Sequence, residues 1–284
     1  MLRQLPLLLI STAGLLAAKP EPTRSTTYKT ASDTQLKLFL FEPDGHKATD
    51  KRPAVVFFFG GGWNGGSPSQ FYPHCAYLAS RGMVAMAADY RVKSRQNTSP
   101  FECVKDGKSA IRWVRQNATK LGIDAARVAA GGGSAGGHVA AATGNLRGLE
   151  EEGEDLKTAS KPDALLLFNP VYDNGPNGYG HSRVKDRWKE ISPMHNIRKD
   201  APPTIVFLGS KDKLIPVSTA EAYKAKMQKA GARCDTHIYE GQPHGFFNEG
   251  RSSNPSYYHM TVHAMDQFLG SLGWLKGKPT IPAK

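Results

Sequence analysis

The chain has 284 residues, of which 37 are Lys or Arg and 25 are Asp or Glu, so its formal net charge is +12 at pH 7. No block of five or more basic residues and no nucleic-acid-binding motif accompanies this charge, which argues for a basic, solvated surface and against a nucleic-acid partner. The length suits one large domain better than two. A domain of this size needs no disulfide framework, so we expect Cys75, Cys103 and Cys234 to be free, buried thiols.

Residues 1–18 have the pattern of a secretory signal peptide. They begin with a positive charge at Arg3, continue with an apolar stretch from Leu5 to Leu16 and end in two alanines. This pattern predicts a mature domain of residues 19–284 in the periplasm or outside the cell, with no stable membrane insertion after processing. A retained N-terminal anchor is the alternative interpretation.

Beyond a polar segment at 19–27, which we expect to be a linker, short apolar runs alternate with longer amphipathic ones. The short runs predict strands at 36–41, 53–59, 83–88, 127–131, 164–168, 204–208 and 234–239. Helices are expected near 68–81, 100–121, 135–142, 216–231 and 255–271. Because most strands are apolar throughout, they predict a mainly parallel sheet with helices on both faces.

The sequence Gly132-Gly133-Ser134-Ala135-Gly136 lies between a predicted strand and a predicted helix. A G-x-S-x-G motif in this context is typical of a sharp, strained turn that lifts the serine hydroxyl clear of the sheet. A phosphate-binding loop is the competing interpretation. It would require a Lys-Ser or Lys-Thr pair at its end, and here Gly137 is followed by His138.

Two further reactive side chains follow later strands, in the order Asp212 and then His244. The carboxyl ends of parallel strands meet at one edge of a sheet, so both are expected near Ser134. A histidine can take the serine proton near neutral pH, and a carboxylate orients the ring and stabilises its charged form. Ser134, Asp212 and His244 are therefore the predicted catalytic residues, with Asp173 as an alternative acid.

The loop Gly60-Gly61-Gly62-Trp63 follows the strand at 53–59. Backbone N–H groups that point at a developing oxyanion lower the barrier of acyl transfer, and glycines let the main chain come close. We assign this role to Gly61 and Gly62, together with Ala135 after the serine. Trp63 is expected to line the substrate pocket.

The polar segment 173–196 is expected to form a lid or pocket wall. Its candidate contact residues are Tyr179, His181, Arg183 and Trp188. Since it provides no large apolar cap, it favours short acyl groups. The acidic loop 150–155 is expected to be solvated surface, because its carboxylates lack the spacing of a metal site.

In combination and in order, several segments resemble the α/β-hydrolase superfamily, especially its bacterial feruloyl-esterase-like and hormone-sensitive-lipase-like carboxylesterases. The segments are FFFGGGWNGGSP, AADYRV, IRWVRQNATKLGIDAARVAAGGGSAGGHVAA, GSKDKLIP and QPHGFFN. The resemblance implies an α/β-hydrolase fold, a Ser134, Asp212 and His244 triad, and an oxyanion hole in the glycine loop, with no metal or organic cofactor. One departure is Phe59, where these families usually carry histidine.

These observations predict a serine carboxylesterase that hydrolyses short-chain acyl esters of the acetyl or feruloyl type, including esters on carbohydrates. An amide hydrolase of the same fold, such as a formamidase or a peptidase, is the nearest alternative. A catalytically silent hydrolase fold used for binding is another. The sequence leaves the oligomeric state open.

Overall fold

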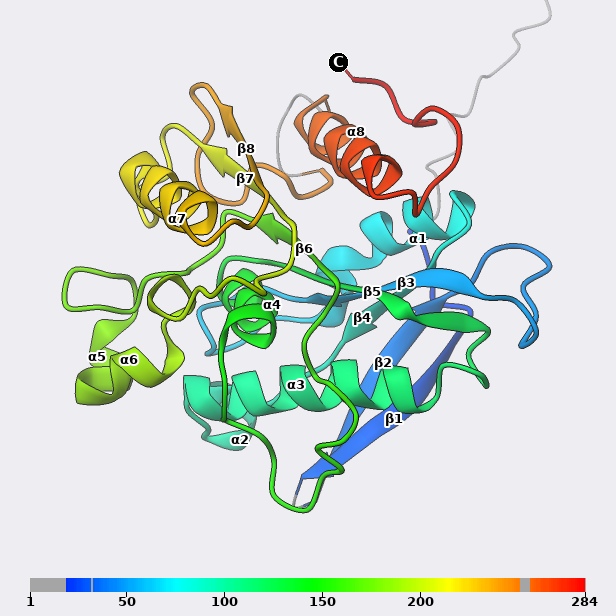
Figure 1. The fold of residues 1–284 in the computed structure, drawn as a ribbon, viewed down its shortest axis with the longest axis horizontal. Coiled ribbons are helices and arrows are strands. Elements are labelled where there is room, and N and C mark those ends of the chain that lie inside the picture. The colour runs from blue at the N-terminus through cyan, green and yellow to red at the C-terminus, as the bar shows by residue number, and fades with distance from the viewer. Residues whose placement is uncertain (1–18, 32, 251–255, 284) are drawn as a thin grey trace, which may run out of the picture.

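The computed structural model describes residues 19–31, 33–250 and 256–283, so the predicted signal peptide at 1–18 lies outside it. The described residues form one eight-stranded sheet in the order β1-β2-β4-β3-β5-β6-β7-β8 (Figure 1). The strands are β1 (Arg24–Ala31), β2 (Thr34–Phe41), β3 (Arg52–Phe58), β4 (Val84–Ala88), β5 (Ile123–Gly133), β6 (Ala164–Phe168), β7 (Thr204–Gly209) and β8 (Cys234–Tyr239). Strand β2 is antiparallel to β1 and β4, and every pairing from β4 to β8 is parallel. The predicted mainly parallel sheet is confirmed.

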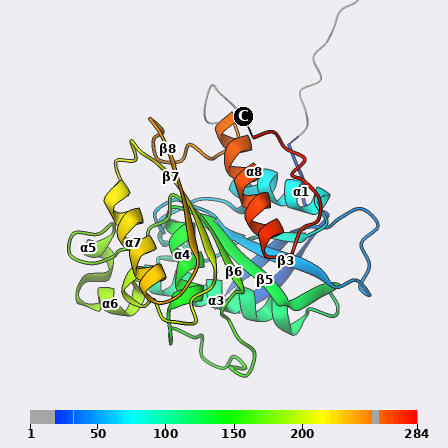
Figure 2. The same ribbon diagram turned by 45° about the horizontal axis from the view of Figure 1, so that its top comes forward.

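Helices cover both faces of this sheet, as Figures 1 and 2 show. They are α1 (Tyr72–Ser80), α2 (Lys93–Gln96), α3 (Pro100–Gln116), α4 (Ala135–Asn145), α5 (His181–Val184), α6 (Trp188–Ile191), α7 (Val217–Lys229) and α8 (Ser256–Ser271). Helices α1 and α8 pack on one face, and α3, α4 and α7 pack on the other. Among the described residues, no helix has the length and apolar character needed to cross a bilayer.

Side chains along β3 after Arg52 are all apolar and alternate between the two faces of the sheet, so this strand contributes to two hydrophobic cores. Val56 and Phe58 join the cluster under α3 and α4, whereas Val55 and Phe57 join the one under α1 and α8. All four side chains are fully buried. Burying a side chain of this size stabilises the fold by roughly 1.5–3 kcal/mol, so this strand contributes to both layers. The three cysteines are free and buried as expected, and burial raises the pKa of each thiol.

The expected linker at 19–27 is wrong for its second half, because β1 begins at Arg24 and pairs with β2. This edge strand is rich in threonine and exposes one face, so it lacks the apolar run that marked the others. Tyr28 anchors it by donating a hydrogen bond to the carbonyl of Asp89 at 2.7 Å.

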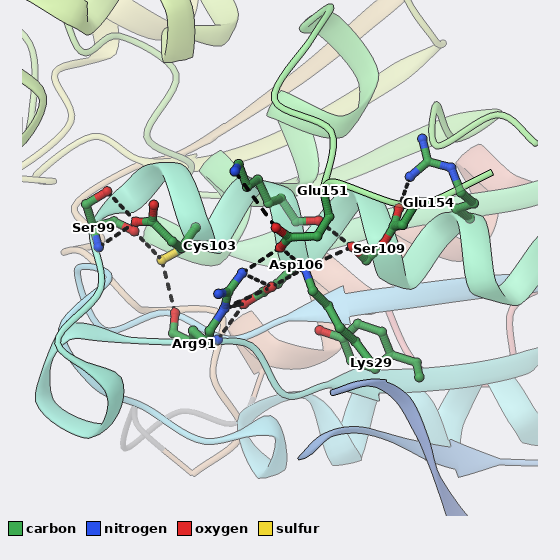
Figure 3. A network of polar contacts seen from close by, with 12 residues as sticks. Lys29, Arg91, Ser99, Cys103, Asp106, Ser109, Glu151 and Glu154 are labelled. Carbon is green, nitrogen blue, oxygen red and sulfur yellow. Dashed lines mark hydrogen bonds and ion pairs between the residues drawn. The ribbon is translucent and has the colours of Figure 1, made fainter. Parts of the chain in front are cut away.

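A buried ion cluster joins β1 to α3 and to the loop after α4 (Figure 3). The carboxylate of Asp106 is fully buried, and it accepts hydrogen bonds from Lys29 Nζ at 2.7 Å and from the Arg91 guanidinium. Glu151 lies 2.5 Å from Lys29 Nζ and 2.9 Å from Arg91 Nη2. Two carboxylates thus neutralise two cations that would otherwise be buried alone.

The acidic loop 150–155 is therefore not simply solvated surface. Besides Glu151, Glu150 pairs with Lys108 at 2.6 Å and with Arg112, and Glu154 also pairs with Arg112. Lys108 and Arg112 belong to α3 and are almost completely buried. The expectation fails because sequence spacing does not show that α3 presents cations opposite this loop.

Replacing Asp106 by alanine should destabilise the protein by about 3–5 kcal/mol, because Lys29 and Arg91 would keep their charges without their central partner. Urea denaturation measures the loss. The matched control is Asp124→Ala, which removes a more exposed pair with Arg127 and should cost much less. Equal losses in the two variants would contradict the assigned role of the cluster.

The ring of His74 is fully buried and has no hydrogen-bond partner among the described residues. It is surrounded by aromatic side chains, namely Phe57, Phe71, Phe168, Phe247 and Tyr258. Burial lowers its pKa to about 3. The folded protein keeps this ring neutral, whereas an unfolded chain binds a proton below about pH 6.5. Stability must therefore fall as the pH drops from about 6.5 towards 3, by about 1.4 kcal/mol per pH unit.

The variant His74→Phe should lose this pH-dependent destabilisation. Its free energy of unfolding, relative to that of the wild type, should therefore rise steadily as the pH is lowered from 7 to 5. Urea unfolding curves at several pH values test this. The stability of His74→Phe should still fall to some extent as the pH drops, because burial also lowers the pKa of His138, to about 4. If both proteins lose stability with the same slope, His74 does not have the stated effect.

Candidate active site

Ser134 lies in a strained turn between β5, which ends at Gly133, and α4, which begins at Ala135. Its φ of 54° and ψ of −119° place it at a backbone conformation that side-chain-bearing residues rarely adopt. A Cβ at Gly132 would collide with the Gly136 backbone, and one at Gly136 would collide with the carbonyl oxygens of Phe58 and Phe59. The predicted requirement for small residues around the serine is confirmed, because α4 packs directly against β3 here.

The structure brings Ser134, His244 and Asp212 into one hydrogen-bonded chain at the carboxyl edge of the sheet. His244 Nε2 lies 2.9 Å from Ser134 Oγ, and His244 Nδ1 lies 2.7 Å from Asp212 Oδ2. The other oxygen of Asp212 accepts backbone N–H groups of Leu214 at 2.8 Å and Ile215 at 3.0 Å. The Asp212 carboxylate is buried and the His244 side chain is 22% exposed, so the histidine faces the site while its partner is fixed behind it.

The alternative acid, Asp173, is directed elsewhere. Its Oδ1 accepts the N–H of Gly175 at 2.7 Å and lies 3.8 Å from His195 Nδ1. The structure therefore favours Asp212 over Asp173 as the partner of His244.

The backbone N–H groups of three residues have no hydrogen-bond acceptor in the described part of the chain. These residues are Gly61, Gly62 and Ala135. Gly61 and Gly62 have φ values of +124° and +62°, which only glycine adopts readily. The loop turns its main chain towards the pocket that holds Ser134. These donors are thus available to an incoming oxygen, as an oxyanion hole requires.

Three amide side chains that the sequence analysis missed hold the loops of this site. Gln70 accepts the N–H of Gly60 at 2.6 Å and donates to Asn248 at 2.8 Å. Asn248 in turn donates to the carbonyl of Gly245 at 2.8 Å, so the glycine loop and the histidine loop are joined. Asn169, fully buried after β6, accepts the N–H of Gly245 at 2.9 Å and lies 3.4 Å from His244 Nε2.

The position of Asn169 directly after a predicted strand could have revealed it, since that is where Asp212 and His244 were found. Gln70 and Asn248 carry no such signal, because they lie 178 residues apart and meet only in the fold.

Phe59, which stands where related families carry histidine, is held by Tyr90. The two rings stack with centroids 4.1 Å apart, and the Tyr90 hydroxyl donates to the Phe59 carbonyl at 2.6 Å. Both side chains are fully buried. The start of the glycine loop is therefore fixed by stacking and one hydrogen bond.

The structure places Trp63 outside the wall of the cavity at Ser134, although this residue borders a neighbouring hollow. Its side chain is 1% exposed, packs edge-on against the His138 ring at 5.0 Å and does not line the cavity at Ser134. A Cβ at Gly180 would touch the indole, so the 173–196 segment covers it. An aromatic residue after a glycine loop serves packing here, which the sequence pattern could not distinguish from ligand contact.

A cavity of about 720 Å³ opens above Ser134 and His244. Much of its wall is polar, with side chains of Asn64, Ser67, Ser69, Gln70, Asn169, Tyr179, Arg183 and Asn248. Leu214 and Phe247 are its apolar side chains. Of the residues expected from the 173–196 segment, Tyr179 and Arg183 line the cavity, whereas His181 and Trp188 do not.

A serine in a strained strand-to-helix turn, bonded to a histidine and an aspartate from later strands of a mainly parallel sheet, defines the class of α/β hydrolases. Two family models match the chain, BD-FAE over residues 40–173 and the prolyl oligopeptidase family over residues 153–271. The apo form of Thermogutta terrifontis esterase 2 superimposes with a TM-score of 0.87 and 46% identity, covering 92% of this chain and 98% of that one.

Two curated relatives, both from Mycobacterium tuberculosis, are similar at the sequence level. Esterase LipC is 30% identical over 79% of this chain, and esterase LipQ is 30% identical over 78%. The chain spans less than two thirds of these two proteins, 59% and 55% of their lengths. From these matches, the chain belongs to the carboxylesterases of the α/β-hydrolase superfamily.

A matched pair of substitutions tests which carboxylate supports His244. Asp212→Asn should lower kcat on p-nitrophenyl acetate by about 10⁴-fold, because an amide favours the wrong histidine tautomer. Asp173→Asn keeps an acceptor for the Gly175 N–H and should change kcat by no more than a few-fold. The assignment fails if Asp173→Asn is the more damaging change.

Proposed function

We propose that this protein hydrolyses short-chain carboxylic esters through an acyl-enzyme intermediate on Ser134. The observation that carries the proposal is the hydrogen-bonded chain from Ser134 through His244 to Asp212. It borders a cavity that is also lined by Gly61 and Gly62, whose N–H groups are unpartnered in the described part of the chain.

Acylation begins when His244 Nε2 takes the proton of Ser134 as Oγ attacks the ester carbonyl carbon. The carbonyl oxygen becomes an oxyanion that accepts hydrogen bonds from the N–H groups of Gly61, Gly62 and Ala135. Asp212 Oδ2 accepts a hydrogen bond from the Nδ1–H group of the ring and stabilises the imidazolium. The carbon–oxygen bond to the alcohol then breaks, and His244 returns the proton to the leaving alkoxide.

Deacylation repeats these steps with water in place of the serine. His244 removes a proton from water, the hydroxide attacks the acyl carbon, and the same N–H groups stabilise the second oxyanion. The bond to Ser134 Oγ breaks, the serine recovers its proton from His244, and the carboxylic acid leaves.

The cavity wall supports short acyl groups and polar alcohols, because its apolar side chains, Leu214 and Phe247, are few. Structures of Thermogutta terrifontis esterase 2 have been described with propionate bound and with butyrate bound. The same esterase has been described phosphorylated by paraoxon. By similarity, we propose acyl groups of two to four carbons. The polar side chains in the cavity wall support a carbohydrate as the alcohol half.

Replacing Ser134 by alanine should lower the turnover of p-nitrophenyl acetate by about 10⁵- to 10⁶-fold, because no nucleophile remains. The control Ser218→Ala removes an exposed hydroxyl from α7 and should leave turnover unchanged. A Ser134→Ala rate within a few-fold of the wild type would overturn the proposal.

A series of p-nitrophenyl esters tests the acyl preference. We expect kcat/KM to be highest between acetate and butyrate and to fall by at least tenfold at decanoate, since Leu214 and Phe247 are the only apolar side chains in the described cavity wall that a long alkyl chain could contact. A rise in kcat/KM with chain length would contradict a short-acyl site.

An amide hydrolase is the second candidate, favoured by the match of the prolyl oligopeptidase family model to residues 153–271. Rates on aminoacyl p-nitroanilides, compared with p-nitrophenyl acetate, distinguish the two. We also propose a periplasmic or secreted location from the sequence of residues 1–18. Sequencing the N-terminus of the exported protein tests it.

A further inference from the structure

Arg183 contributes a cation to the cavity beside the glycine loop. Its Nη1 donates to the carbonyl of Gly62, and its guanidinium lies over the Trp63 ring, 5.6 Å from the centroid. A Cβ on Gly62 would be 3.2 Å from Arg183 Nη1 and 3.4 Å from the Tyr179 hydroxyl, so both groups lie directly above this residue. The buried indole and the loop carbonyl thus hold the cation within reach of an ester bound at Ser134.

The same arginine also lines a second hollow of about 520 Å³. The two hollows share Gly62, Asn64 and Arg183, so they meet at the glycine loop. The second contains the polar side chains of Asn97, Thr98, Ser99 and Ser182, and a second cation, Lys93. The second hollow therefore adjoins the cavity at Ser134, with Arg183 at the boundary of both.

Neither hollow has an aspartate or glutamate in its lining. In contrast, the hollow between β2 and α1 is lined by Glu21, Glu42 and Asp44. Arg183 and Lys93 form no ion pair with a carboxylate in the described part of the chain, and Nε and Nη2 of Arg183 donate to no group there. Their neighbours in sequence are paired, Arg187 with Glu190 and Arg95 with Asp89.

We propose that Arg183, assisted by Lys93, binds a carboxylate on the alcohol half of the substrate, so that the preferred esters are short acyl groups on uronic-acid-containing oligosaccharides. This inference rests on the proposed esterase function and narrows its substrate class. The alcohol half is assigned because the second hollow offers far more polar space than an acetyl or butyryl group requires. Guanidinium–carboxylate hydrogen bonds supply both attraction and orientation.

The experiment compares acetate release from one acetylated uronic-acid oligosaccharide in two forms, with free carboxylates and with the carboxylates converted to methylamides. The wild type should prefer the charged form by about tenfold in kcat/KM, through a lower KM. The variant Arg183→Gln should bring this ratio close to one, Arg183→Lys should restore part of it, and Lys93→Gln should reduce it. Added salt should weaken the preference.

Two controls separate substrate recognition from other effects. Arg187→Gln removes an equal charge from the same segment outside the hollows and should keep the tenfold ratio. The neutral oligosaccharide is the second control. Loss of the bond to the Gly62 carbonyl in Arg183→Gln would lower the rates on both forms together and leave their ratio near ten, whereas loss of carboxylate binding lowers only the rate on the charged form.

The inference is overturned if the wild type treats both oligosaccharide forms alike, or if Arg183→Gln keeps the preference, while p-nitrophenyl acetate is still hydrolysed. Loss of activity on p-nitrophenyl acetate in the wild type would instead refute the proposed function. A preference for p-nitrophenyl hemisuccinate over p-nitrophenyl butyrate, without one among the oligosaccharides, would place the anion on the acyl half and refute the assignment.

Discussion

The close approach of α4 to the end of β3 is the constraint on which the site depends. Gly136 lies against the carbonyl oxygens of Phe58 and Phe59, at a spacing that leaves no room for a Cβ. This contact turns the chain sharply after β5 and holds Ser134 at a φ of 54°. Backbone strain of this kind costs on the order of 1–3 kcal/mol and persists only where the surroundings enforce it. Here the two buried cores on either side of β3 do so.

Neutral amides connect the glycine loop to the loop that carries His244. Gln70 and Asn248 join the glycine loop to the loop after β8, and Asn169 holds the latter from β6. A neutral amide can support His244 and the free N–H groups without placing another charge beside a developing oxyanion. The strong ion pairs of Asp106 and Lys108, both on α3, stabilise the scaffold instead. Figure 3 shows those around Asp106.

The sequence predicted the features that depend on local pattern. Continuous apolar runs located the parallel strands from β3 to β8, and glycine spacing around Ser134 located the turn, because both reflect steric requirements that act over a few residues. The threonine-rich edge strand β1 was missed, since a strand exposed on one face lacks an apolar run. Trp63 was assigned to the substrate pocket, but its ring is almost fully buried and does not line the cavity at Ser134, because composition does not show which face of a loop packs inward.

Features formed by residues far apart in the chain could not be predicted from the sequence. The pairing of the acidic loop with α3, the Gln70–Asn248 bond and the place of Arg183 over Trp63 all require the fold. Asp212 was the predicted acid, and Asp173 stayed an alternative because both follow strands. Hydrogen-bond geometry distinguished them, since only Asp212 reaches the histidine ring.

The central claim is that His244 activates the Ser134 hydroxyl for attack, and covalent trapping tests it most directly. After treatment with paraoxon, peptide mass spectrometry should find one diethylphosphoryl group per chain, on Ser134, formed far more slowly in His244→Ala. Labelling of another residue, or labelling of Ser134 at an equal rate without the imidazole, would contradict the account.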